Sequence, residues 1–376
     1  MLRVWNLSLV CATFALTILG TFITRSGVVE SVHAFSTSNI GPALLGFFGV
    51  IVAVTVGLIA WRGDRLRSPG RIDSPISREG SFLANNLLFA VFAFVVLLGT
   101  IFPLIVEALR DEQLSVGTPY FSRMTMPLGL MLLFLMAVAP VLPWRKAGME
   151  LLRHRLQWPA WVGAAAIVLA VVIGARGFFA LLAFALGGFA AGSALRQVAL
   201  ASRRNGWRGF VGRTNGGMIV HLGVIMIGVA LAASGSYLRQ AELRFTEGQT
   251  IEFADQAITY EGMRTTEHKD RVEIAAVVDV DGTELTPATN RFIATGQVTG
   301  SPGTKSTLTR DSQITLISQP EAAGESVVLR ITVQPLISWL WIGGLVMAIG
   351  TVLSAFPSKL QRKPTDPVSA PVAVSA

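Results

Sequence analysis

The segment that decides the fold is Thr21–Ser36, which reads TFITRSGVVESVHAFS. An apolar run ends within it, and a short polar segment with one arginine, one acid and one histidine follows. A second apolar run begins near Ile40. His33 is therefore predicted to lie just outside a membrane, in a short connection between two spans. An imidazole in that position can meet a ligand that lies at the lipid boundary.

The composition is that of an integral membrane protein. Of the 376 residues, 52% are hydrophobic and 14% are charged, and a soluble protein of this size does not bury so much apolar surface. The net charge of +8 is interpreted as arginines that mark the cytoplasmic face, and no nucleic-acid partner is expected. The single cysteine, Cys11, excludes a disulfide framework and a CxxC thiol-exchange site. The first apolar run is longer than the core of a secretory signal, so a retained span is expected.

Eight apolar runs approach or reach the length of about 20 residues that crosses a bilayer core. They are residues 5–24, 41–61, 82–106, 124–143, 159–175, 177–195, 216–235 and 336–356. The fifth and sixth runs are separated by only three residues, so they form either a tight hairpin or a partly re-entrant pair. The prediction is an α-helical integral membrane protein with about eight transmembrane helices.

The basic residues predict the orientation. With a cytoplasmic N-terminus, the inner segments hold eighteen arginines and lysines, and the short outer loops hold only Arg25, Arg110, Arg123 and Arg176. Under the positive-inside rule both termini are cytoplasmic and the His33 loop is outside. The expected location is the inner (plasma) membrane of the cell.

A soluble insert, residues 236–335, precedes the last span. Three of its segments are predicted to be strands, because their residues alternate between apolar and polar or are rich in β-branched types: 272–280, 313–318 and 326–334. Residues 301–310 are predicted to be a loop. The insert is net acidic and is expected to form a small outer β-rich sandwich or barrel-like sheet. The expected division is therefore a transmembrane bundle at 1–235 with the histidine loop at 25–40, the insert, a final helix at 336–356, and a disordered cytoplasmic tail at 357–376.

Of the four histidines, His154 and His268 lie in charged segments and are interpreted as ordinary loop residues. His221 lies about six residues into the seventh run, where an ionisable side chain is a functional candidate. Four glycines reduce the side-chain bulk of that helix, which allows a neighbouring helix or a flat macrocycle to come close to its backbone: Gly216, Gly217, Gly223 and Gly228. A neutral histidine bonded to an adjacent helix is the alternative, and ion-coupled transport is a third, although no acid lies within the spans.

His33 has aliphatic and aromatic neighbours, which suit a planar, hydrophobic, iron-bearing ligand. An exposed loop histidine is the alternative. Arg25, one residue past the span, can pair with a haem propionate or with a membrane lipid phosphate.

These residues carry a family resemblance. TFITRSGVVESVHAFS (21–36) closely resembles the RSGVLxSVHAF segment of the CcmF family of cytochrome c-type biogenesis proteins, the large membrane subunit of a haem lyase. RTNGGMIVHLGVIMIGVALAASGSY (213–237) is similar to the family's later histidine-bearing span, and VQPLISWLWIGGLVMAIGTVLSAFP (333–357) to its final span. The likeness covers essentially the whole chain.

The resemblance implies an enzyme that attaches haem through thioether bonds to the CxxCH motif of apocytochrome c. It implies that His33 ligates the substrate haem at the outer face and takes part in catalysis. It also implies that His221 is one of two iron ligands of a haem b within the spans. The implied partners are a haem chaperone, apocytochrome c and other maturation subunits, some of which the outer β domain would contact.

The sequence departs from the family in one respect. The family's tryptophan-rich WWD segment, its first outer histidine and its other haem b ligand are not found here. The chain is thus expected to be the C-terminal part of such a protein, incomplete without a missing N-terminal half that bears the WWD segment. The competing interpretations are a membrane scaffold of the maturation complex without haem ligation of its own, and a membrane transporter.

Overall fold

The computed structural model describes residues 3–26, 40–66, 74–112, 114–144, 148–318 and 326–356. His33, most of the 25–40 loop and the 357–376 tail lie outside these residues. The chain divides into two compact units, which are described separately. One comprises Met1–Leu128 with Pro143–Ala147, and the other Gly129–Leu142 with Gly148–Ala376.

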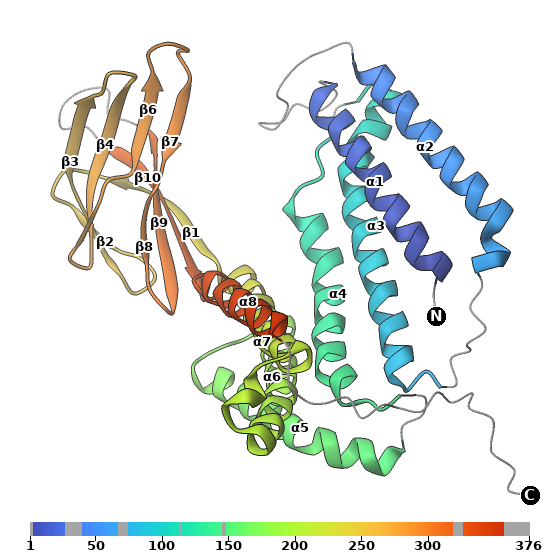
Figure 1. Cartoon of the computed structure of the whole chain (residues 1–376). Coiled ribbons are helices and arrows are strands. Elements are labelled where there is room, and N and C mark those ends of the chain that lie inside the picture. The colour runs from blue at the N-terminus through green and yellow to red at the C-terminus, as the bar shows by residue number, and fades with distance from the viewer. Residues whose placement is uncertain are drawn as a thin grey trace, which may run out of the picture. The chain divides into compact units, whose positions relative to one another are not determined.

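Long apolar helices make up the first unit (Figure 1). They are α1 (Arg3–Arg25), α2 (Gly41–Arg62) with the short η1 (Gly63–Leu66), α3 (Arg78–Arg110) and the first half of α4 (Thr118–Val138). α3 begins where the Ser77 hydroxyl accepts a hydrogen bond from the amide of Gly80, and it ends at Asp111 in the left-handed conformation. α3 meets α4 at Gly99, where a Cβ atom would lie 2.5 Å from the ring of Tyr120. The missing side chain thus permits close packing of the two helices.

The second unit holds the remaining helices. They are the second half of α4 with η2 (Ala139–Val141), α5 (Met149–Val172), α6 (Phe178–Asn205), η3 (Gly206–Phe210), α7 (Arg213–Tyr237) and α8 (Trp339–Ala355). α5 and α6 are two separate helices that are joined by a short turn and pack against each other, and each is long and apolar enough to cross a membrane. The α7–α8 pair is closely packed, because Gly223 and Gly343 face each other without side chains between them.

Seven helices of the described chain, α1 to α7, are long and apolar enough to cross a membrane. α8 is also apolar but has only 17 residues. The predicted class is therefore confirmed: an α-helical membrane protein with a β-rich region before the final helix.

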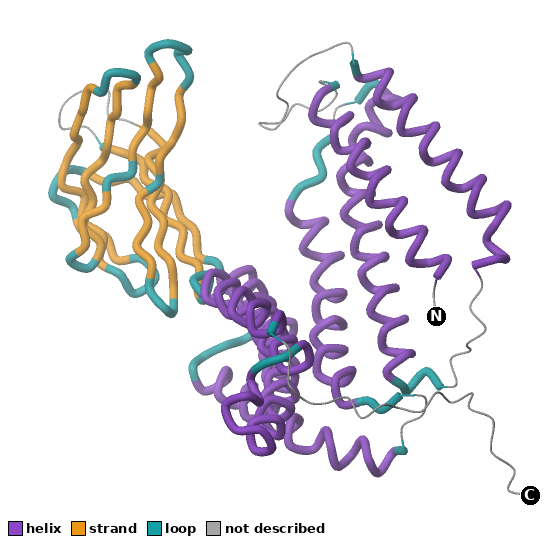
Figure 2. The backbone as a smooth tube through the Cα atoms, viewed as in Figure 1, coloured by secondary structure: helices purple, strands orange, loops and turns teal. Residues whose placement is uncertain are grey.

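The β-rich region consists of two antiparallel sheets (Figure 2). The first has the strand order β1 (Arg239–Phe245), β10 (Val327–Pro335), β9 (Arg310–Ser318) and β8 (Gly303–Ser306). The second has the order β2 (Thr250–Glu252), β3 (Ala257–Glu267), β4 (Arg271–Val280), β6 (Ala288–Phe292) and β7 (Val298–Ser301), with β5 (Thr283–Leu285) paired to β4. Alternate residues of these strands form one buried core that includes Phe245, Ile258, Val278, Ile314 and Leu329.

The three strands expected at 272–280, 313–318 and 326–334 correspond to β4, β9 and β10. The loop expected at 301–310 is wrong in part, because β8 forms there and pairs with β9. β8 is a short edge strand whose residues alternate between partly exposed and exposed, so it lacks the apolar alternation that marks a buried strand.

Candidate functional site: a histidine within α7

His221 is the ninth residue of α7, which places it about 12 Å along the helix axis from Arg213. Its Nδ1 atom lies 2.9 Å from the carbonyl oxygen of Gly217, one turn earlier in the same helix. A carbonyl oxygen only accepts hydrogen bonds, so Nδ1 carries the proton in this contact. In a neutral imidazole the lone pair then lies on Nε2, the nitrogen that would bind a metal.

The glycines of α7 serve different purposes. Gly216 and Gly223 face α8: a Cβ atom at Gly223 would lie 2.5 Å from the carbonyl oxygen of Gly343, and one at Gly216 would contact Ser354. Gly228 faces Leu133 of α4 at 3.4 Å. These three positions therefore accommodate neighbouring helices, which was one of the two alternatives considered for them.

Gly217 differs from these three. A Cβ atom there would meet no atom within 4 Å, and Gly217 shares a helix face with His221 because the two are four residues apart. Open space on this face of α7 thus lies one turn from the imidazole. The i, i+4 spacing was visible in the sequence, but the open space beside Gly217 was not.

Two features of the site would allow His221 to hold a haem iron. His221 offers a neutral imidazole with Nε2 directed away from its own hydrogen bond, and the missing Gly217 side chain leaves room for a flat ring. Within the described segments no group of three or more histidine, cysteine, aspartate or glutamate side chains could hold a metal ion.

Of the two candidates in the predicted 25–40 loop, only Arg25 lies within the described residues. His33 lies outside the described residues, so its surroundings are not part of the site geometry. Arg25 is the last residue of α1 and is exposed. Its expected contact with a propionate or a lipid phosphate stays a prediction.

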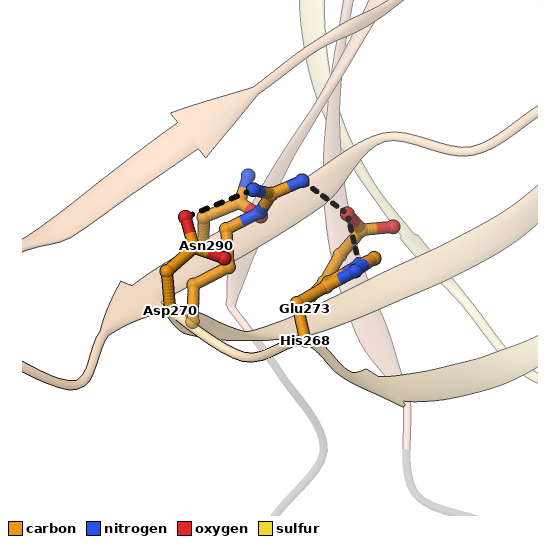
Figure 3. A network of polar contacts seen from close by, with 5 residues as sticks. His268, Asp270, Glu273 and Asn290 are labelled. Carbon is orange, nitrogen blue, oxygen red and sulfur yellow. Dashed lines mark hydrogen bonds and ion pairs between the residues drawn. The ribbon is translucent and has the colours of Figure 1, made fainter.

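The other two histidines have simpler surroundings. His154 is exposed but lies in the second turn of α5, so its interpretation as a loop residue is wrong. His268 belongs to a polar network at the β3–β4 turn, where its Nε2 lies 3.5 Å from Glu273 (Figure 3). In the same network Arg271 contacts Asp270 at 3.4 Å and Asn290 of β6 at 3.1 Å. The network fastens the turn to the neighbouring strand, which is a structural role for His268.

A second connection ties the end of α7 to the α5–α6 turn. The Tyr237 hydroxyl donates a hydrogen bond to the Arg176 carbonyl and accepts one from the Arg176 amide. The Arg176 guanidinium donates in turn to the carbonyls of Val171 and Ala175 at the end of α5. The helix that carries His221 is thus held at its C-terminal end by hydrogen bonds as well as by packing.

Comparison with known proteins reveals similarity along nearly the whole chain. No protein-family model matches the sequence. The chain is 30% identical to the cytochrome c-type biogenesis protein CcmF of Pseudomonas aeruginosa, with 96% of this chain and 56% of that protein covered. It is 32% identical to the cytochrome c-type biogenesis protein CycK of Bradyrhizobium diazoefficiens, again with 96% and 56% covered.

A solved structure shares the fold. The structure described as cytochrome c heme lyase CcmF superposes with a TM-score of 0.75 and 29% sequence identity, covering 94% of this chain and 55% of that one. The chain therefore spans about 56% of the length of the curated relatives that it matches. In sequence and in fold, this chain is similar to cytochrome c-type biogenesis proteins of the CcmF type and fits the C-terminal part of such a protein.

Proposed function

We propose that this chain is part of a cytochrome c haem lyase, which holds haem at the outer membrane face while it is attached to the CxxCH motif of apocytochrome c. The observation that carries the proposal is the likeness over 94% of the chain to a solved haem lyase. The geometry of His221 supports it, because a membrane-embedded imidazole with an available Nε2 fits haem ligation.

At the outer face the substrate is haem and the group proposed to hold it is His33. Each thioether bond forms when a cysteine thiol adds across a vinyl double bond: the sulfur bonds to one vinyl carbon and the proton goes to the other. The enzyme's main task is to keep vinyl groups and thiols within reach, so positioning dominates. His33 fixes the ring from one side as an axial ligand, and Arg25 contacts a propionate.

Within the spans, His221 would hold the iron of a haem b through Nε2. That group, when bound, supplies one-electron chemistry for keeping the substrate haem reduced. The Gly217 carbonyl holds the His221 ring in one orientation and one tautomer, so Nε2 is available without a rearrangement of the side chain. The missing side chain of Gly217 leaves space on the same face of α7 that a flat ring could occupy.

For each of the two proposed haems, this chain offers one candidate histidine ligand, His33 or His221. We infer that a second polypeptide part, corresponding to the N-terminal half with the WWD segment, supplies the remaining ligands. The chain covers 56% of the length of its Pseudomonas aeruginosa relative and 55% of the solved structure, which supports this inference. A haem chaperone, apocytochrome c and other maturation subunits are the further proposed partners, with the β domain at 236–335 as a surface for them.

The proposed location is the inner membrane, with several spans and both termini cytoplasmic. The excess of arginine and lysine in the segments assigned to the cytoplasm supports this orientation. Three arginine–tryptophan stacks lie at helix ends of those segments. Arg62 stacks on Trp61 at 4.6 Å, Arg78 on Trp144 at 5.2 Å and Arg208 on Trp207 at 5.7 Å. Tryptophan and arginine together are typical of the membrane–water interface.

The test uses the chain expressed with its N-terminal partner and a periplasmic reporter cytochrome that carries one CxxCH motif. His33→Ala is expected to reduce covalent haem on the reporter by about tenfold or more, as losing an axial or positioning ligand does. His154→Ala is the matched control, since His154 is an exposed histidine near the other face. Unchanged reporter haem in His33→Ala would remove His33 from the mechanism.

A visible absorbance spectrum of the purified complex separates this proposal from a scaffold. A Soret band that depends on this chain supports haem handling. A colourless complex that still assembles with the other maturation subunits would support the scaffold interpretation instead.

A further inference from the structure

The segment that joins α6 to α7 is strongly basic. No aspartate or glutamate occurs anywhere from residue 151 to residue 241. Within that stretch, arginines gather around the short η3 helix: Arg203, Arg204, Arg208 and Arg213. All four are exposed. Their charge is therefore not neutralised by any acid close in sequence.

This segment is held rigidly by the helices around it. Gly206 has φ +58° and ψ −143°, a conformation open to glycine, and it turns the chain back after α6. Gly209 is buried so closely against the backbone of Ser202 that a Cβ atom would not fit. The Gly212 amide donates a 3.0 Å hydrogen bond to the Leu353 carbonyl near the end of α8. The arginines are thus presented on a turn clamped between α6 and α8.

Two aromatic side chains lie among the arginines. Trp207 is 73% exposed and Phe210 is 45% exposed. The Arg208 guanidinium lies 5.7 Å from the centre of the Trp207 ring. An aromatic ring that inserts at the level of lipid glycerol groups, next to guanidinium groups that pair with phosphate, is the arrangement that recognises a phospholipid headgroup.

The position of the turn fits that ligand. It connects α6 and α7, two helices long and apolar enough to span a membrane, so it lies where the hydrocarbon core ends. Exposed guanidinium groups prefer phosphate oxygens, with which they form paired hydrogen bonds. A zwitterionic headgroup also carries phosphate, but only an anionic headgroup supplies a net charge opposite to that of four arginines.

We propose that the turn Arg203–Arg213 is a binding site for the headgroup of an anionic phospholipid, in which the arginines pair with phosphate and Trp207 anchors in the interface. The site lies on the segment that joins α6 to α7. It includes neither His33 nor His221, the residues proposed to hold haem. Bound lipid stabilises the turn that connects α6 to the histidine-bearing α7.

The experiment reconstitutes the whole chain with its N-terminal partner in lipid nanodiscs. The bilayers contain either phosphatidylglycerol or phosphatidylcholine with brominated acyl chains, at equal mole fraction in an unlabelled phosphatidylcholine background. Bromine quenches tryptophan fluorescence at short range. Because the chain has eight tryptophans, the signal of Trp207 is taken as the difference between the unsubstituted protein and Trp207→Phe.

The expected result is stronger quenching of the Trp207 signal by the brominated anionic lipid. Each arginine changed to glutamine, at positions 203, 204 and 208, is expected to reduce the preference for the anionic lipid by up to about fivefold. Arg62→Gln, next to Trp61 at the end of α2, is the matched control and leaves the Trp207 preference unchanged. Equal quenching by the two lipids would overturn the proposal. So would a preference for the anionic lipid that remains when the arginines at positions 203, 204 and 208 are all changed to glutamine together.

A salt titration of the unsubstituted protein tests the same pairing without a variant, so incorrect membrane insertion of a variant cannot affect its result. Because the attraction is electrostatic and exposed to solvent, higher ionic strength is expected to weaken the lipid preference. A preference that does not change with salt counts against arginine–phosphate pairing.

Discussion

The carbonyl oxygen of Gly217 lies 2.9 Å from Nδ1 of His221. This contact within one helix decides which ring nitrogen is protonated, and it does so without any side chain from elsewhere. Gly217 therefore has two effects on the candidate site: its carbonyl orients the imidazole, and its missing side chain leaves open space beside it.

Replacing His221 with alanine tests its assignment as an iron ligand. In the purified complex, His221→Ala is expected to lower the b-type haem content about tenfold or more, because a single remaining ligand holds the iron weakly. The measurement is the reduced-minus-oxidised spectrum relative to protein. His154→Ala serves as the control, and full retention of haem b in His221→Ala would show that the ligand is elsewhere.

Replacing Gly217 with leucine tests the open space. Gly217→Leu is expected to reduce haem content without lowering the melting temperature, since no protein atom lies within 4 Å of the new Cβ position. Gly235→Leu is the matched variant, because Gly235 is another glycine of α7 with nothing within 4 Å. Equal haem content in the two variants would mean that the ring does not lie against Gly217.

The α7–α8 interface is tested by two adjacent glycines of α8. A Cβ atom at Gly343 would lie 2.7 Å from the Gly223 carbonyl oxygen, whereas one at Gly344 meets nothing within 4 Å. Gly343→Ala is expected to destabilise the protein by about 1–3 kcal/mol through overpacking. Gly344→Ala is expected to be neutral or to stabilise by about 0.5–1 kcal/mol through helix propensity. Thermal unfolding of both variants in one detergent compares them, and an equal effect would contradict the packing.

The β domain at 236–335 is predicted to lose stability at high pH through Tyr260. Burial, and secondarily the negative charge of Glu247, raise the pKa of the Tyr260 phenol above its ordinary value of 10.0. Below pH 10 the phenol is neutral in both the folded and unfolded states, so its contribution to stability is fully present. Above pH 10 the unfolded phenol ionises first, and stability falls as the pH rises through the folded pKa.

Tyr260→Phe removes this ionisation. Its melting temperature is expected to fall less than that of the unsubstituted protein between pH 9 and pH 11, and Glu247→Gln is expected to lie between the two. Parallel losses in the unsubstituted protein and Tyr260→Phe would show that other groups cause the alkaline transition.

Much of the fold was predictable because the signals are local. A run of apolar residues marks a span whatever its neighbours are, so each predicted run has its helix. The bounds differ: α5 begins ten residues before the run predicted at 159–175, and α6 ends ten residues after the run predicted at 177–195. Strands β4, β9 and β10 follow from their own alternation or β-branched content. β8 was missed because an exposed edge strand buries little, so its sequence carries no apolar alternation.

The candidate site was predictable only in part. His221 stands out because an ionisable residue within a span is rare. The contact between Arg271 and Asn290 depends on strand pairing, in which Glu273 lies opposite Asn290, and no local pattern predicts it.

The amino-acid sequence by itself determined the membrane class, the succession of apolar helices with a β-rich region before the last one, and the presence of a histidine within an apolar helix. The tertiary structure decided which glycines of α7 contact α8 and which one leaves space beside His221. The physical reason is that hydropathy and β-alternation are properties of a few consecutive residues. The direction in which a glycine faces is fixed by the rotation of its helix against a neighbour that lies far away in the sequence.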